Sequence, residues 1–153
     1  MATPGALARG LLLFWALWLS VVSASNTVDA LQAAGVLAPG LSFASGNFAL
    51  VADSLSVYSL PRACAAGLFA LVLILEITAS ALFWRAAVVA EPKAIEPFFV
   101  AIGLFCAFLV FDEVLLVYRR YPGLETTHFA VLSALILSLV LIRVLDDEMG
   151  RRR

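Results

Sequence analysis

The stretch ACAAGLFALVLILEITASALFW, residues 63–84, contains a single charged side chain, Glu76, near its middle. More than 20 mostly apolar residues can cross a bilayer as a helix, because each residue advances about 1.5 Å through a hydrocarbon core about 30 Å thick. A carboxylate at the centre of such a helix costs about 2.5–3.5 kcal/mol on insertion scales, so it usually faces a protein interior or a polar cavity. The stretch therefore predicts a membrane-spanning helix with a candidate functional residue at its centre.

The composition of the whole chain agrees with this interpretation. Of 153 residues, 63% are hydrophobic and 14% charged, whereas soluble domains average about 25% charged residues. The length suits one integral membrane domain, residues 1–153, and the net charge of −1 gives no reason to expect a nucleic-acid partner. Cys64 and Cys106 lie within apolar runs without metal-type spacing, so we expect them to pack as small side chains and not to form a disulfide.

Four segments are long and apolar enough to span a membrane: residues 8–27, 63–84, 97–118 and 127–145. Because an open sheet cannot satisfy its edge hydrogen bonds in lipid, the segments predict an all-α bundle of four transmembrane helices. Pro97 suits a first helical turn, Pro122-Gly123 separates the last two segments, and Glu91-Pro92-Lys93 lies in the link between the second and third. Arg9 and Val22-Ser23-Ala24 also allow the first segment to be a cleaved signal peptide, although we favour a retained helix.

Basic residues predict the orientation, because cytoplasmic loops are enriched in Lys and Arg. An even number of spans places seven basic residues on one side and three, Arg62, Arg119 and Arg120, on the other. The seven are Arg9, Arg85, Lys93, Arg143 and Arg151-Arg152-Arg153. Both termini are therefore predicted to be cytoplasmic.

The long outer loop, residues 28–62, is predicted to contain an amphipathic helix. Ser45 or Asn47 suits its N-terminal cap, and apolar side chains then recur at helical spacing at Phe48, Val51, Leu55 and Tyr58. A weaker helical stretch covers residues 27–34. We expect the outer helix to lie on the membrane surface or over the outer mouth of the bundle, as a lid or docking surface.

Small residues predict which helix faces meet, because membrane helices associate by close packing and polar contacts. The expected packing residues are Gly103 and Cys106 in the third segment and Ala130, Ala134 and Ser138 in the fourth. The third-segment seam continues through Val110 to Glu113, so Glu113 is expected to point into the bundle and Asp112, about 100° around the helix, to point away. With Ser80 one turn from Glu76, these residues form the candidate intramembrane polar set: Glu76, Glu113, Asp112 and Ser80.

The remaining distinctive side chains suggest no chemistry. Motifs for phosphate binding, metalloprotease activity and Ser/His/Asp catalysis are missing from the sequence, so we expect no enzyme activity, metal site or cofactor. His128 is the only histidine and is expected to lie where the fourth helix enters the membrane. Aromatic residues near the expected membrane boundaries are interpreted as interfacial anchors, namely Trp15, Trp18, Trp84, Tyr118 and Tyr121.

The order of these elements resembles that of domain-of-unknown-function family 2165, a bacterial family of predicted small integral membrane proteins. The resemblance lies in Asn26 after the first span, Glu76 in the second, and an acidic motif, Asp112-Glu113-Val114 with Tyr118, ending the third. It also includes Asn47-Phe48-Ala49-Leu50-Val51 in the outer helix and Glu125-Thr126-Thr127-His128-Phe129 before the fourth span. The resemblance implies four spans with a long loop after the first, favours Glu76 and Glu113 over Asp112, and implies no reaction. Because the family is bacterial, it also implies that the protein lies in a bacterial inner membrane.

Three functions fit the sequence. The leading hypothesis is a non-catalytic subunit or scaffold that assembles with a larger membrane protein complex, or with further copies of itself, in the lipid bilayer. The alternative is a proton- or cation-coupled transporter or channel that uses Glu76 and Glu113. A redox anchor for haem or quinone is a third, and it requires ligands from another chain. For Glu76, we favour a hydrogen bond that holds helices together over a role in ion transport.

Overall fold

The computed structural model describes residues 4–89 and 95–151, and the described chain is entirely helical apart from turns and loops. Six helices follow one another: α1 (Pro4–Ala33), α2 (Asn47–Ser56), α3 (Arg62–Val89), α4 (Glu96–Val114), α5 (Val117–Arg120) and α6 (Leu124–Arg151). Of these, α1, α3, α4 and α6 are long and apolar enough to cross a membrane. The predicted all-α bundle of four membrane-spanning helices is therefore confirmed.

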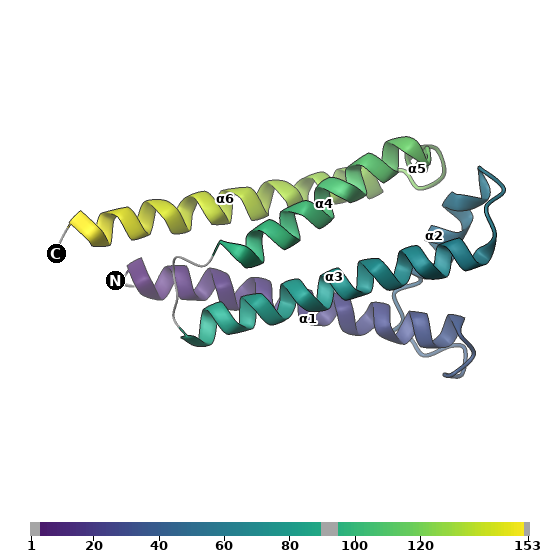
Figure 1. Cartoon of the computed structure of the whole chain (residues 1–153), viewed down its shortest axis with the longest axis horizontal. Helices are drawn as coiled ribbons and strands as arrows, with labels where there is room; N and C mark the ends of the chain where they lie inside the picture. Colours follow the sequence, from purple (N-terminus) through teal and green to yellow (C-terminus); the bar gives the residue numbers. More distant parts are fainter. Residues whose placement is uncertain (1–3, 90–94, 152–153) are drawn as a thin grey trace.

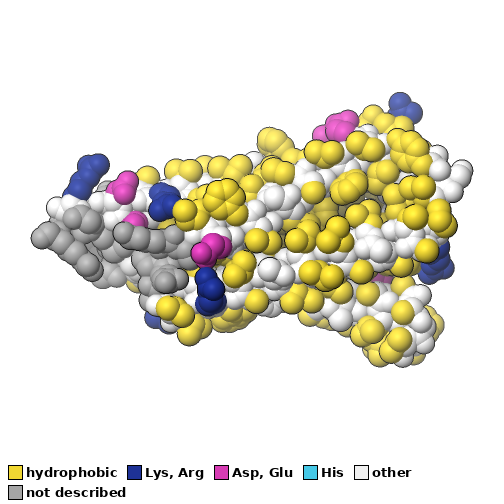
Figure 2. All heavy atoms as spheres, viewed as in Figure 1, with side chains coloured by type: hydrophobic (Ala, Val, Ile, Leu, Met, Phe, Trp, Pro, Cys, Tyr) yellow, Lys and Arg dark blue, Asp and Glu magenta, His cyan; other side chains and the backbone are white. Residues whose placement is uncertain are grey.

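The long helices run side by side, and the first turn of α1 lies at the same end as the last turn of α6 (Figure 1). The opposite end contains α2 and α5, and we call it the α2 end. Charged side chains gather at the two ends on the face shown in Figure 2, with a broad hydrophobic band between them. This distribution is what a bilayer requires, because apolar side chains face lipid while charged ones reach the two aqueous boundaries.

The helices α1 and α4 differ from the predicted segments. The first predicted span ended at residue 27, whereas α1 continues to Ala33 and includes the stretch that was expected to form a separate, weaker helix. The third was predicted to reach residue 118, but α4 ends at Val114. The predicted link Glu91-Pro92-Lys93 lies outside the described residues.

The early end of α4 has a physical reason in the packing beyond it. Leu116 adopts a left-handed backbone conformation (φ 53°), which breaks the helix and is unfavourable for a side chain with a Cβ atom. The break turns Leu115 and Val117 into a buried cluster with Leu55 of α2. The Val114 carbonyl, freed at the helix end, accepts a hydrogen bond from the Tyr58 hydroxyl at 2.5 Å. Burial of two apolar side chains and this bond offset the backbone cost.

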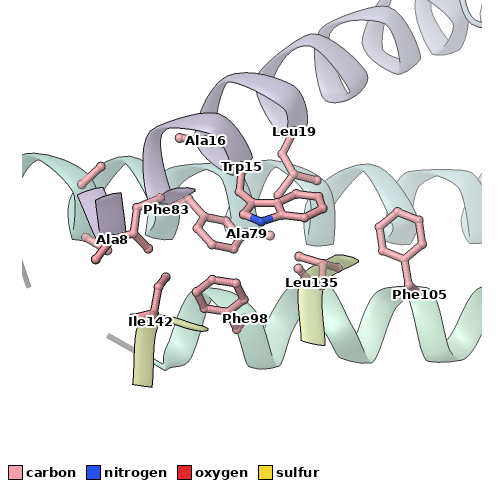
Figure 3. Packing of buried hydrophobic residues seen from close by; sticks show 14 residues of the cluster. Ala8, Trp15, Ala16, Leu19, Ala79, Phe83, Phe98, Phe105, Leu135 and Ile142 are labelled. Carbon is pink, nitrogen blue, oxygen red and sulfur yellow. The ribbon is translucent and has the colours of Figure 1, made fainter. Parts of the chain in front are cut away.

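The main hydrophobic core is built mainly from the first halves of α1 and α4 and the second halves of α3 and α6, so it lies toward the end of the bundle opposite α2. Figure 3 shows its side chains from close by. Phe83 of α3 and Phe98 of α4 meet edge to face, with ring centroids 4.9 Å apart, and both are fully buried. Ala16 of α1 and Ala79 of α3 are also fully buried, as expected where two helix backbones approach closely. Alanines and large aromatic rings together therefore bring the helices into contact.

The predicted packing residues do not occupy this core. Gly103 and Cys106 of α4 and Ala130 and Ala134 of α6 are all exposed, so their predicted role inside the bundle is wrong. The inward face of α4 is instead formed by Phe98, Ala101 and Phe105, which belong to the main hydrophobic core. The remaining predicted packing residue, Ser138, is half-buried and does join two helices, because its hydroxyl oxygen accepts a hydrogen bond from the Trp15 indole at 3.0 Å.

The aromatic residues predicted as interfacial anchors divide into two groups. Trp15 is only 3% exposed and belongs to the core, so its predicted interfacial position is wrong. Trp18 is half-buried against Phe105. Trp84, Tyr118 and Tyr121 retain exposed surface and lie at helix ends or in the turn after α5, where the anchoring role stays a prediction.

Candidate functional site

Glu76 lies at the midpoint of α3 and is 3% exposed. The Asn26 side-chain amide of α1 donates hydrogen bonds of 2.8 Å to both carboxylate oxygens. Asn26 is itself 2% exposed, so neither partner has a competing contact with solvent. The pair joins α1 to α3 through an acceptor and a donor that each satisfy the other, as buried polar groups require.

A third side chain extends this contact to the outer helix. The Asn47 amide, at the first residue of α2, donates a 2.9 Å hydrogen bond to the Asn26 carbonyl oxygen. The three side chains form what we call the polar chain, Asn47–Asn26–Glu76, in which each amide donates toward the carboxylate. The polar chain therefore connects α2, α1 and the centre of α3 through side-chain hydrogen bonds.

Asp29 holds the start of α2 against α1, next to the polar chain. Its carboxylate oxygen Oδ2 accepts the Phe48 backbone N–H at 2.7 Å and the Ser45 hydroxyl at 3.0 Å. The Phe48 N–H is one of the first amide groups of α2, which have no partner within the helix, and the negative carboxylate also suits the positive end of the helix dipole. The cap predicted from Ser45 or Asn47 is thus supplied mainly from α1, one turn after Asn26.

Ser80, the predicted neighbour of Glu76, belongs to a different contact. Its hydroxyl lies 2.9 Å from the Ser20 hydroxyl of α1, which also accepts a hydrogen bond from the Trp84 indole at 3.0 Å. Ser80 makes no hydrogen bond to Glu76 among the described residues. These contacts join α1 to α3 one helical turn from Glu76, on the side away from α2.

The second buried acid is Asp112 of α4, and this reverses the sequence-based assignment. Asp112 is 3% exposed, whereas Glu113 is exposed, so the predictions that Glu113 points inward and Asp112 outward are both wrong. Asp112 Oδ2 lies 2.6 Å from His128 Nδ1 of α6, and the His128 ring stacks on Phe108 at a centroid distance of 4.8 Å. His128 therefore joins α6 to α4 from a half-buried position.

The polar chain and the Asp112–His128 pair line one cavity of about 330 Å³ between the long helices and beneath α2. Its walls are mainly apolar and include Trp18, Phe69 and Phe105, together with Leu50 and Val51 of α2. Figure 1 shows α4 diverging from α3 toward the α2 end, where the cavity lies. Ligand sites commonly combine these properties, namely a volume of about 300–1,000 Å³, apolar walls and a few convergent polar groups.

The chemistry of this site is that of a hydrogen-bond acceptor. Within the described residues, the hydrogen bonds to Glu76 come from the neutral amide of Asn26. The ion pairs among these residues do not include Glu76. A carboxylate in such surroundings can bind a proton, an inorganic cation or a protonated amine. No group of three metal-binding side chains occurs within residues 4–89 and 95–151.

Two of the site residues carried only weak signals in the sequence. Asn26 was noted for its position after the first span, but its contact with Glu76 joins residues 50 apart in the chain. Asp29 was placed in a loop and received no role.

Comparisons with protein-family models, with curated proteins and with solved structures gave no match for this chain.

Proposed function

We propose that the protein is a non-catalytic subunit or scaffold that assembles with a larger membrane protein complex. The observation that carries this proposal is the outward face of α4. Gly103, Cys106, Val110 and Glu113 follow one another at intervals of three or four residues and are all exposed. We call these four residues the α4 seam.

The α4 seam has the composition of a helix-contact surface. Small residues let a second helix approach closely, and van der Waals packing then replaces contacts with lipid. A Cβ atom added at Gly103 would meet nothing within 4 Å, so the chain itself leaves this position open. The seam ends in an exposed carboxylate, which a polar or basic side chain of another subunit would satisfy better than lipid.

A substitution of Gly103 by leucine tests the proposal. Leucine is a better helix former than glycine, which is about 0.8–1.0 kcal/mol less favourable than alanine, and position 103 is open, so we expect the isolated chain to keep its fold. Gly67→Leu on α3 is the matched control, since a Cβ there also meets nothing within 4 Å. We expect Gly103→Leu, and not Gly67→Leu, to lose the partner in native electrophoresis and copurification from mild detergent. Recovery of the wild-type chain as a lone monomer would contradict the proposal.

The buried carboxylate supports a second candidate function, proton- or cation-coupled transport. Glu76 lies at the middle of a membrane-spanning helix, has neutral hydrogen-bond partners and faces a cavity. Asp112 and His128 line the same cavity, whereas Glu113, which was predicted to act with Glu76, is not among its lining residues. Proton or cation flux into liposomes that contain the protein measures this function. Flux that is unchanged in Glu76→Gln would exclude Glu76 as the site.

A separate proposal concerns the orientation of the helices and the membrane that holds them. We propose that both termini face the cytoplasm of a bacterium and that α2 faces the outer side. The support is the excess of Lys and Arg on the side of the termini, together with the resemblance to domain-of-unknown-function family 2165. Reporter fusions at either terminus check this orientation, and activity of a periplasm-specific reporter at the C-terminus would contradict it.

A further inference from the structure

We propose that the cavity beneath α2 is a binding site for an apolar molecule that carries one protonated amine. Binding in this cavity does not depend on assembly with a partner through the α4 seam. The choice of ligand rests on the volume of the cavity, the hydrogen-bonding capacity left at its polar groups, and the sign of the charges along its wall.

The walls of the cavity determine the body of the ligand. Of its lining side chains, most are aliphatic or aromatic, including Trp18, Phe69, Phe108 and Val131 from four different helices. Rings from several directions suit a compact body such as a phenyl ring with a short alkyl chain, because burial of apolar area is the main favourable term. The volume of about 330 Å³ lies at the lower end of the range for small-molecule sites.

The hydrogen bonds already formed determine the polar group. Asn26 uses both of its amide N–H donors on the two oxygens of Glu76, and Asn47 uses one of its two on the Asn26 carbonyl oxygen. A carboxylate has about four acceptor positions, of which Asn26 occupies two. The Glu76 carboxylate can therefore accept further hydrogen bonds, and an ammonium group has the N–H donors to form them.

The charges along the wall favour the same ligand. Two carboxylates line the cavity, Glu76 and Asp112, and Asp112 is paired with His128. The lining residues of the described chain include no Lys or Arg. An anionic ligand would place its charge beside these two carboxyl groups in apolar surroundings, whereas an ammonium group would pair with Glu76 at short range.

The test compares two probes of nearly equal shape with the full-length protein in lipid nanodiscs. The probes are 4-phenylbutylamine, which is protonated at neutral pH, and 4-phenylbutan-1-ol, which is uncharged. Isothermal titration, with empty nanodiscs subtracted, measures saturable binding. We expect the amine to bind about tenfold or more tightly than the alcohol, because hydrogen bonds to a charged partner are the stronger ones.

Three variants locate the site. Glu76→Gln keeps an acceptor for Asn26 and is expected to reduce amine affinity to that of the alcohol. Val72→Phe adds volume to the lining of the cavity without changing charge, and it is expected to weaken both probes. Glu96→Gln is the matched control, because Glu96 lies at the opposite end of α4 in an exposed pair with Arg85, and it is expected to change nothing.

Each contrary result overturns the inference. Equal affinity for amine and alcohol, with no effect of Glu76→Gln, would show that the cavity selects only apolar bodies such as lipid tails. Amine binding that survives Val72→Phe would place the amine outside the cavity. Titrations that match empty nanodiscs would show that no site of this chemistry exists.

Discussion

Replacement of Asn26 by leucine removes the one side chain of the described residues that donates hydrogen bonds to Glu76. The two side chains have similar shapes, so the change deletes the amide without opening a large cavity. It leaves a carboxylate that is 3% exposed without its two hydrogen bonds of 2.8 Å. A buried polar group that loses its partner costs about 1–3 kcal/mol, and we expect Asn26→Leu to lower the free energy of unfolding by that amount.

A double-mutant cycle separates this bond from general packing. Hydrogen bonds between membrane helices have coupling energies of about 0.6 kcal/mol on average and about 1.7 kcal/mol at most. We expect a coupling energy between Asn26 and Glu76 at the upper end of that range, because both oxygens are engaged. Detergent titration of unfolding in mixed micelles measures it for Asn26→Leu, Glu76→Leu and the double variant. Thr78→Val, which removes only an exposed bond within α3, is the control. A coupling energy of zero, or a loss for Asn26→Leu no greater than for Thr78→Val, would refute the reasoning.

Three further predictions concern contacts around the site. Trp15→Phe should cost about 0.5–1.5 kcal/mol of unfolding free energy, because it removes one hydrogen bond between α1 and α6; no measurable loss in detergent titration would contradict this. Asp29→Ala should speed amide hydrogen exchange at Phe48 and along α2, with a loss of about 0.5–2 kcal/mol in local stability, since it removes the cap. Burial and the hydrogen bond to Asp53 raise the pKa of the Tyr121 phenol above 10.0, so its stabilising contribution is full below pH 10.0 and is lost as the pH rises through the raised pKa. The ultraviolet titration of the wild-type protein minus that of Tyr121→Phe should show a phenol that ionises above pH 10.0, and a difference curve with its midpoint at or below pH 10.0 would contradict the shift.

The four spans could be predicted because a bilayer imposes one simple condition on them. A segment must be about 20 residues long and nearly free of charge, and residues 63–84 satisfy this without reference to the rest of the chain. The burial of Glu76 followed from the same condition, since a carboxylate at mid-membrane is costly outside a protein interior. These features depend on the local composition of single segments, which the sequence displays directly.

The orientation of α4 could not be predicted, because it depends on which side chains of the other helices it meets. Small residues were expected to face inward, but the buried face of α4 contains Phe98, Ala101 and Phe105, whereas Gly103 is exposed. Asp112 and Glu113 point about 100° apart around the helix. Choosing the wrong inward face of α4 therefore exchanged the predicted positions of the two acids. The partner of Asp112, His128, lies on another helix, and no local pattern indicates which side chains will meet across that distance.

The assembly of the protein through the α4 seam can be tested directly by photo-crosslinking in native membranes. A benzophenone side chain in place of Val110, which is 62% exposed on the seam, is compared with one in place of Ile74, which is 60% exposed on α3. The two positions are equally accessible and both lie within membrane-spanning helices, so they differ chiefly in the face that they occupy. Irradiation should yield a protein adduct from position 110 and only lipid adducts from position 74. Lipid adducts alone from position 110 would contradict the proposed assembly.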